Sequence, residues 1–77
     1  MKIHFEYGKL LKIDDYASGS VIDVPDKCTV RDLLVMLKLP VYLQKAVAVH
    51  VNGEPVWSAT ILKENDNVRI SRVLSGG

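Results

Sequence analysis

The sequence predicts an α+β fold in which a mixed sheet of four to five strands packs on one main helix. Three observations predict it. Segments in which apolar and polar side chains alternate occur at the start of the chain and throughout its second half. A single stretch between them has apolar side chains at helical spacing. The length of 77 residues and the 48% hydrophobic content suit one domain with one core.

The first strand is predicted in KIHFEY, where Ile3, Phe5 and Tyr7 share the face toward the core. A long polar connection then runs from Gly8 to Gly19. Strand character resumes in VIDVP and ends at the proline, which has no N–H to donate to a sheet.

The main helix is predicted in CTVRDLLVMLKLP, residues 28–40. Thr29 is placed to act as the N-cap, and Asp32 completes a variant of the capping box. Cys28, just before the cap, takes one position of a hydrophobic staple, and Pro40 should end the helix. The buried stripe follows the helical spacing and consists of Val30, Leu33, Leu34 and Leu37.

A hairpin is predicted after the helix. Residues 46–51, AVAVHV, form a strand with the three valines on one face. Asn52-Gly53 is a strong hairpin-turn signal. The following EPVW should be a short edge strand, because Pro55 cannot donate to a ladder.

The last part of the domain completes the sheet. Residues 58–67 suggest a turn of helix and a polar loop, and residues 68–73 a final strand with Val68 and Ile70 inward. A helix after the first hairpin crosses one face of the sheet. This order is the β-grasp, or ubiquitin-like, arrangement, in which the first and last strands lie side by side in the centre. We expect a β-grasp domain at 1–73 and a flexible Gly-Gly tail at 74–77.

Composition excludes several classes of function. The net charge of +1, from 10 basic and 9 acidic residues, gives no reason to expect nucleic acid or an anionic membrane as a partner. A single cysteine excludes an internal disulfide and a Cys-rich metal cluster. No apolar run approaches the ~20 residues of a membrane helix, and MKIHFEYG has no cleavable hydrophobic region. The expected location is the cytoplasm.

The sequence ends in VLSGG, which has two interpretations. One is an ordinary frayed end. The other is chemical: a C-terminal carboxylate, ionised above a pKa of ~3.5, can attack the α-phosphate of ATP to form an acyl-adenylate. Glycines have no Cβ to clash in a narrow active site, and Ser75-Gly76-Gly77 extended spans roughly 10 Å.

The whole chain resembles the ThiS/MoaD family of sulfur-carrier proteins. The resemblance runs through MKIHFEYG, CTVRDLLVMLKLP and VAVHVNGEPV to LKENDNVRISRVLSGG. Its most specific element is the last: an acidic turn, a strand and a terminal Gly-Gly. With VNGEPV as a second marker, the resemblance favours the chemical interpretation of the tail.

The resemblance implies a carrier rather than an enzyme, with no bound cofactor or metal. An E1-like adenylyltransferase of the MoeB/ThiF type uses ATP to adenylate Gly77. Sulfur from a donor such as a desulfurase then converts the carboxyl group to a thiocarboxylate. In the MoaD branch the acceptor is the large subunit of molybdopterin synthase, of which the carrier is the small subunit. In the ThiS branch it is thiazole synthase.

The pathway and the mode of use stay open. The long connection from Gly8 to Gly19 is more MoaD-like, whereas SRVLSGG lacks the proline pair of many MoaD proteins and is closer to ThiS; the balance leans to MoaD. The same terminus could instead join a lysine through an isopeptide bond, as in a ubiquitin-like modifier. A third reading is a β-grasp interaction module with an incidental tail.

Residues beside Gly77 are predicted to bind partners. Arg69 and Arg72 either pair with acids on the activating enzyme or simply solvate the last strand. One of the last apolar pair, Val73 and Leu74, should be exposed for contact with partners. The predicted site consists of Gly77 and Gly76 as the reacting end, with Ser75, Leu74, Val73, Arg72 and Arg69 in partner binding.

Other residues carry weaker signals. Cys28 could relay sulfur, but a small apolar group at the helix staple is favoured. Trp57 is either a core lid or an interface anchor. His4 and His50 should lie ~9.5 Å apart with a strand between them, too far to share a metal. The outer sheet face is predicted to carry short side chains, Ala46, Ala48 and Ser71, and suits docking or plain solvation.

Overall fold

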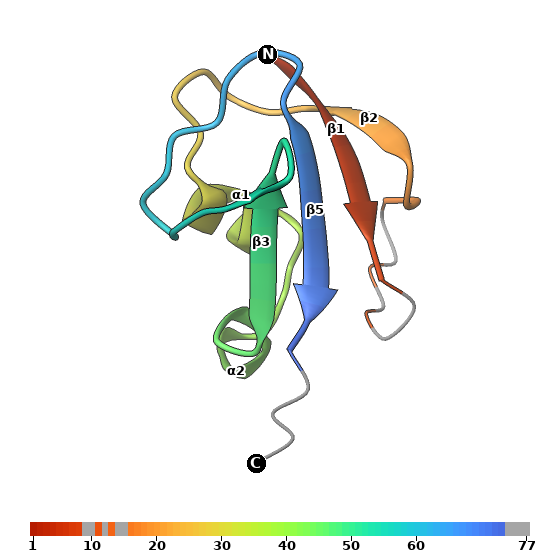
Figure 1. Ribbon diagram of the computed structural model, residues 1–77, viewed down its shortest axis with the longest axis vertical. Coiled ribbons are helices and arrows are strands. Elements are labelled where there is room, and N and C mark those ends of the chain that lie inside the picture. Colours follow the sequence, from red (N-terminus) through yellow and green to blue (C-terminus); the bar gives the residue numbers. More distant parts are fainter. Residues whose placement is uncertain (9–10, 12, 14–15, 74–77) are drawn as a thin grey trace.

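The computed structural model describes residues 1–8, 11, 13 and 16–73. It has a mixed five-stranded sheet in the order β2-β1-β5-β3-β4, with α1 across one face and α2 at one end (Figure 1). This confirms the α+β, ubiquitin-like β-grasp fold. The elements are β1 (Lys2–Tyr7), β2 (Ser20–Asp23), α1 (Val30–Met36), α2 (Val41–Gln44), β3 (Val47–Val51), β4 (Glu54–Pro55) and β5 (Asn67–Arg72).

The first and last strands pair in the centre, as predicted. β1 and β5 are parallel, with Phe5 opposite Val68, and β2 and β3 flank them in antiparallel pairing. Because β5 runs parallel to β1, the C-terminal end of β5 lies at the end of the molecule opposite to Met1 (Figure 1). The topology therefore carries the last described residues away from the N-terminus.

The core lies between the sheet and α1. Its side chains include the predicted inward residues of β1 and β5 and the whole predicted stripe of the helix: Ile3, Phe5, Val68, Ile70, Val30, Leu33, Leu34 and Leu37. The connection from Gly8 to Gly19, predicted to be polar, also contributes to the core, because Leu11 and Ile13 are buried. The Tyr7 hydroxyl donates to the carbonyl oxygens of Ile13 and Tyr16, at 3.3 and 2.9 Å, and so ties this connection to β1.

The capping box at the start of α1 is confirmed. The Asp32 backbone N–H donates to Thr29 Oγ1, and the Thr29 N–H donates back to Asp32 Oδ2, each at 3.1 Å. Hydrogen bonds to the Asp32 carboxyl from the backbone N–H and the side chain of Thr29 lower its pKa. Two orphan N–H groups of the first turn are thereby satisfied.

The end of α1 corrects one prediction. The helix ends before Pro40 through a Schellman motif, in which Lys38 has a positive φ of 60°. The Leu39 N–H donates to the Leu34 carbonyl at 3.3 Å, and the Lys38 N–H to the Val35 carbonyl at 2.9 Å. Pro40 instead serves as the N-cap residue of α2, a short second helix that the sequence analysis missed.

The predicted turn of helix in residues 58–67 is absent. The carbonyl oxygens of Ser58 and Thr60 accept the N–H groups of Arg31 and Val30, at 3.0 and 2.9 Å. The Thr60 N–H donates to the Trp57 carbonyl at 3.0 Å, so this segment makes one tight turn and no helix, and Ile61 then forms a bridge with Thr29. The N–H groups at the start of α1 require acceptors, and this tertiary requirement outweighs the local helix preference of residues 58–67.

The hairpin at Asn52-Gly53 is confirmed, with φ values of 54° and 85° that suit a type I′ turn. Asn52 Nδ2 also donates to Oδ1 of the buried Asp66 at 3.0 Å, which joins the hairpin to the turn before β5. The edge strand is shorter than EPVW, because β4 contains only Glu54 and Pro55. β3 begins at Val47, one residue later than predicted.

Candidate functional site

The end of β5 is the described part of the predicted site. The Val73 N–H donates to the Ala46 carbonyl oxygen at 2.8 Å, directly beyond the pairing of Arg72 with Val47. This bond holds the backbone of Val73 beside the segment that joins α2 to β3. The other predicted residues, Leu74, Ser75, Gly76 and Gly77, lie outside the described residues.

Apolar side chains lie exposed around this point. Val73 is 51% exposed, which fits the prediction that one of the last apolar pair is accessible. In α2, Val41 and Tyr42 are 68% and 73% exposed, whereas Leu43 packs against the core and anchors the helix. Together with two cations, they form what we call the β5-end cluster: Val41, Tyr42, Lys45, Arg72 and Val73.

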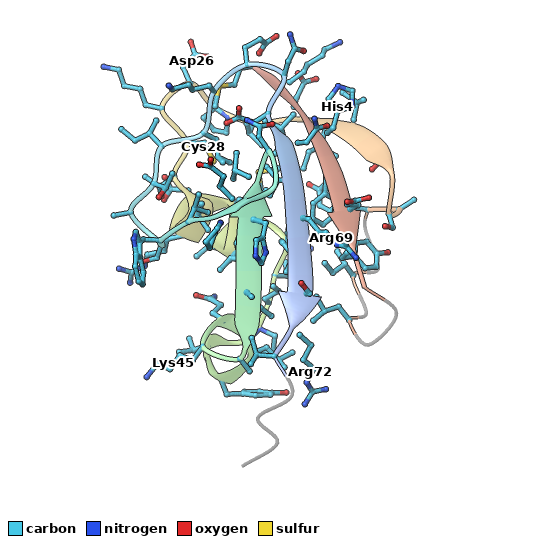
Figure 2. All side chains as sticks on the ribbon, in the orientation of Figure 1. His4, Asp26, Cys28, Lys45, Arg69 and Arg72 are labelled. Atoms are coloured by element: carbon cyan, nitrogen blue, oxygen red, sulfur yellow. The ribbon has the colours of Figure 1, made fainter. Side chains whose placement is uncertain are left out.

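The β5-end cluster carries positive charge. Lys45 and Arg72 lie at the same end of the molecule, while Asp26 lies at the other end beside the N-terminus (Figure 2). The sequence has no Asp or Glu between Asp32 and Glu54, or after Asp66. Within the described residues, Arg72 has no ion-pair partner. An acidic partner surface would therefore approach this end with favourable electrostatics.

Arg69 lies on the outer sheet face and is already engaged. Its Nε is 3.9 Å from Glu6 Oε1, and both side chains are largely exposed. An ion pair of this kind contributes at most about 1 kcal/mol. Arg69 therefore remains able to exchange Glu6 for a carboxylate on a partner, but it is less free to do so than Arg72.

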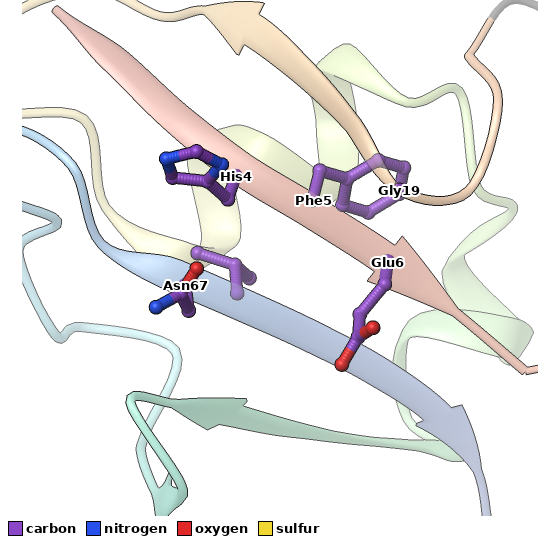
Figure 3. Close-up of a pocket in the computed structure, with 6 residues that line it drawn as sticks. His4, Phe5, Glu6, Gly19 and Asn67 are labelled. Carbon is purple, nitrogen blue, oxygen red and sulfur yellow. The ribbon is translucent and has the colours of Figure 1, made fainter.

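The rest of the outer face is shallow and polar. A hollow of about 240 Å³ lies over β1 and β5, with the side chains of His4 and Glu6 on one strand and Asn67 on the other (Figure 3). As predicted, β5 separates His4 from His50. Among the described residues, no group of three or more His, Cys, Asp or Glu side chains could hold a metal ion. Nor is any helix in that part of the chain long and apolar enough to cross a membrane.

Cys28 and Trp57 have distinct environments. Cys28 is 3% exposed, and burial together with the Asp32 charge raises the pKa of its thiol. A buried, protonated thiol is a poor nucleophile, so the structure favours the staple interpretation over a sulfur relay.

Trp57 is 83% exposed and is not a core lid. The sequence analysis missed Tyr42, for which VYLQ after Pro40 was the available signal.

Comparison with known proteins adds a family and a fold. The model of the ThiS family matches residues 7–77. No curated protein sequence matches the chain. Among solved structures, SAMP1 from Haloferax volcanii is 19% identical, with all of both chains covered and a TM-score of 0.74. A protein assigned as molybdopterin converting factor subunit 1, from Pyrococcus furiosus, is 22% identical over 95% of this chain and 98% of that chain, with a TM-score of 0.72. At these identities the solved structures support the fold alone.

Proposed function

Because the chain belongs to the ThiS family, whose model matches it through its last residue, we propose that it is a sulfur carrier that works through the Gly77 carboxylate. The single observation that carries this proposal is the family match from residue 7 to the terminal Gly-Gly. The protein acts as a co-substrate in the cytoplasm, and its partners supply the catalytic groups.

The chemistry has two steps. In the first, a carboxylate oxygen of Gly77 attacks the α-phosphorus of ATP in an E1-like enzyme of the MoeB/ThiF type, and pyrophosphate leaves. In the second, hydrosulfide (HS⁻) attacks the activated carbonyl carbon, and AMP leaves. Where a desulfurase supplies the sulfur as a protein persulfide, the persulfide attacks instead, and a reducing thiol then cleaves the S–S bond of the acyl persulfide. The product is a thiocarboxylate at Gly77. A C-terminal segment of Leu74, Ser75, Gly76 and Gly77 suits entry into such a site because its last two residues have no side chains.

The β5-end cluster is the docking surface in this proposal. Val73 and Tyr42 offer apolar contact area, and Arg72 attracts acidic groups on the partner. Apolar anchors within a polar rim are the usual design of protein interfaces. Arg69 adds a second cation on the outer face after it leaves Glu6.

We propose molybdopterin synthase as the acceptor, with this chain as its small subunit. The long connection between β1 and β2 and the fold shared with the Pyrococcus furiosus protein support this choice over thiazole synthase. The purified large subunit of molybdopterin synthase should convert the pterin precursor when the thiocarboxylated form of this protein is added. It should not do so when the form with an ordinary C-terminal carboxylate is added. Conversion by thiazole synthase instead would redirect the proposal to thiamin synthesis.

A second candidate is a ubiquitin-like modifier. The fold shared with small archaeal modifier protein 1 from Haloferax volcanii, at 16% identity and a TM-score of 0.70, favours testing it. Both uses begin with the same adenylate, so they differ only in what attacks the activated carbonyl.

Intact-mass measurement separates the candidates. The protein is incubated with ATP, an E1-like enzyme and a sulfur source. Replacement of one oxygen by sulfur, a gain of ~16 Da, supports the carrier. Higher-mass conjugates with lysines of other proteins support the modifier. Neither change with a cognate activating enzyme would reject both and leave a β-grasp interaction module.

A further inference from the structure

One edge of the sheet is left open along the first half of β3. β4 pairs only with His50 and Val51, and the last bond across this edge runs from the Val56 N–H to the Val49 carbonyl at 3.1 Å. The Ala46 carbonyl accepts from the Val73 N–H on the β5 side, so alternation directs the backbone groups of Val47 and Val49 to the opposite side. Among the described residues, the Val47 N–H, the Val47 carbonyl and the Val49 N–H have no backbone partner there.

A groove follows this open edge. Two adjoining hollows of about 280 and 310 Å³ share Leu34, Gln44 and Ser58 in their walls. The first is lined by consecutive residues of β3, both inward ones such as Val49 and outward ones such as Ala48. Successive residues of a strand point to opposite faces of the sheet, so a hollow that contacts residues of both faces must lie along the backbone edge of that strand. We call the two hollows together the β3-edge groove.

The hollow beside β3 has a mainly apolar lining, with one large exposed anchor. Trp57 flanks the open strand and is 83% exposed, more than any other large apolar side chain described. Leu34 on α1 also lines this hollow. An exposed indole beside unpaired backbone groups is the arrangement that a bound strand would cover.

The charge of the β3-edge groove selects its occupant. Arg31 and Lys45 line the second hollow, and none of the described residues that line either hollow is acidic. The charge of Arg31 also lowers the pKa of the neighbouring Asp32 carboxyl, so it is partly balanced, whereas Lys45 has no ion-pair partner among the described residues. The groove therefore offers main-chain pairing and a mainly apolar lining at one end and the positive charges of Arg31 and Lys45 at the other.

We propose that the β3-edge groove binds an extended peptide segment of a partner protein, apolar in its middle and acidic at its end, which adds to β3 as an extra strand. Main-chain hydrogen bonds from Val47 and Val49 supply the pairing, as in other cases of strand addition. Lys45 and Arg31 receive the acidic side chains. This site goes beyond the proposed sulfur-carrier function and does not depend on Gly77.

The test uses a defined probe, the blocked peptide Asp-Asp-Val-Ile-Val-Ile-Asp-Asp, titrated into the full-length protein and followed by NMR. We expect the largest amide shifts at Val47 and Val49, and quenching of Trp57 fluorescence. The double variant Arg31→Gln/Lys45→Gln should weaken binding by roughly fivefold. The matched double variant Lys2→Gln/Lys63→Gln, with the same loss of charge away from the groove, should leave binding unchanged.

Two further peptides make the result decisive. N-methylation of alternate residues removes the N–H groups that pair with β3 and should abolish binding; replacement of the aspartates by lysines should do the same. The proposal is overturned by equal binding of either peptide, by shifts centred on the outer sheet face, or by no binding at millimolar peptide. Self-association of the protein through β3 would likewise overturn it. None of these results bears on thiocarboxylate formation at Gly77, which is measured separately.

Discussion

The backbone N–H of Val73 donates to the carbonyl oxygen of Ala46 at 2.8 Å, while the Val73 side chain stays half exposed. The backbone at the end of β5 is thus fixed against the start of β3, and the side chain is left for other contacts. This combination suits the role proposed for Val73, which is to contact a partner next to the proposed reacting end of the chain. The Val73 side chain can therefore be substituted to test the proposed function without disturbing the core.

Substitution Val73→Asp should weaken docking without unfolding the protein. A charge at this exposed position removes apolar contact with the activating enzyme, so KM for the protein in ATP–pyrophosphate exchange should rise about tenfold with kcat nearly unchanged. The matched control is Val21→Asp on β2, because Val21 is 52% exposed, close to the 51% of Val73. An equal rise in KM for both variants would contradict a role specific to Val73.

Substitution Arg72→Gln should slow association. Loss of a cation from the β5-end cluster reduces electrostatic steering, so the on-rate for the activating enzyme should fall a few-fold at low salt and converge with wild type at high salt. Stopped-flow fluorescence over a range of ionic strength measures this. Lys63→Gln, which removes the same charge away from β5, is the control. A salt-independent difference would argue against steering by Arg72.

Substitution Cys28→Ala should leave sulfur transfer intact. The thiol is buried, and its raised pKa keeps it protonated at neutral pH. The variant should lose about 1 kcal/mol of stability from the smaller core side chain, measured by urea unfolding. Thiocarboxylate yield per folded protein should match wild type. A loss of sulfur loading in fully folded Cys28→Ala would revive the relay interpretation.

Asp32 should make the free energy of unfolding depend on pH in the acid range. Hydrogen bonds from the Thr29 backbone and side chain hold the pKa of the folded Asp32 carboxyl below its ordinary value of 3.8. A depressed folded pKa stabilises the protein above the unfolded value, and this stabilisation is lost as pH falls through the folded one. The advantage of wild type over Asp32→Asn in urea unfolding should therefore be full at neutral pH and shrink as pH falls below 3.8. An advantage that stays constant down to acid pH would refute this assignment.

Signals confined to neighbouring residues were read correctly from the sequence. The capping box at Thr29 and Asp32 and the Asn52-Gly53 turn each depend on a few adjacent positions, so the chain alone determines them. The order of strands followed from the single crossover helix. These features together located the end of β5, and hence the predicted site residues from Arg69 to Val73.

Signals that depend on distant contacts were read wrongly. The turn of helix expected in residues 58–67 does not form, because the Ser58 and Thr60 carbonyls accept hydrogen bonds from the first turn of α1. Leu11 looked like part of a polar connection because nothing nearby shows that it reaches the core. α2 has no side-chain cap and only one turn, so its residues gave no helix pattern, and the exposed Tyr42 was overlooked with it.

The most direct test of the account locates the sulfur atom. Wild type, a variant lacking Gly77 and a variant extended by one alanine are each incubated with ATP, the E1-like enzyme and a sulfur source, and fragments are sequenced by mass spectrometry. The account predicts a gain of ~16 Da on the Gly77 fragment of wild type only. A gain at Cys28 or elsewhere, or an equal gain in either variant, would contradict it.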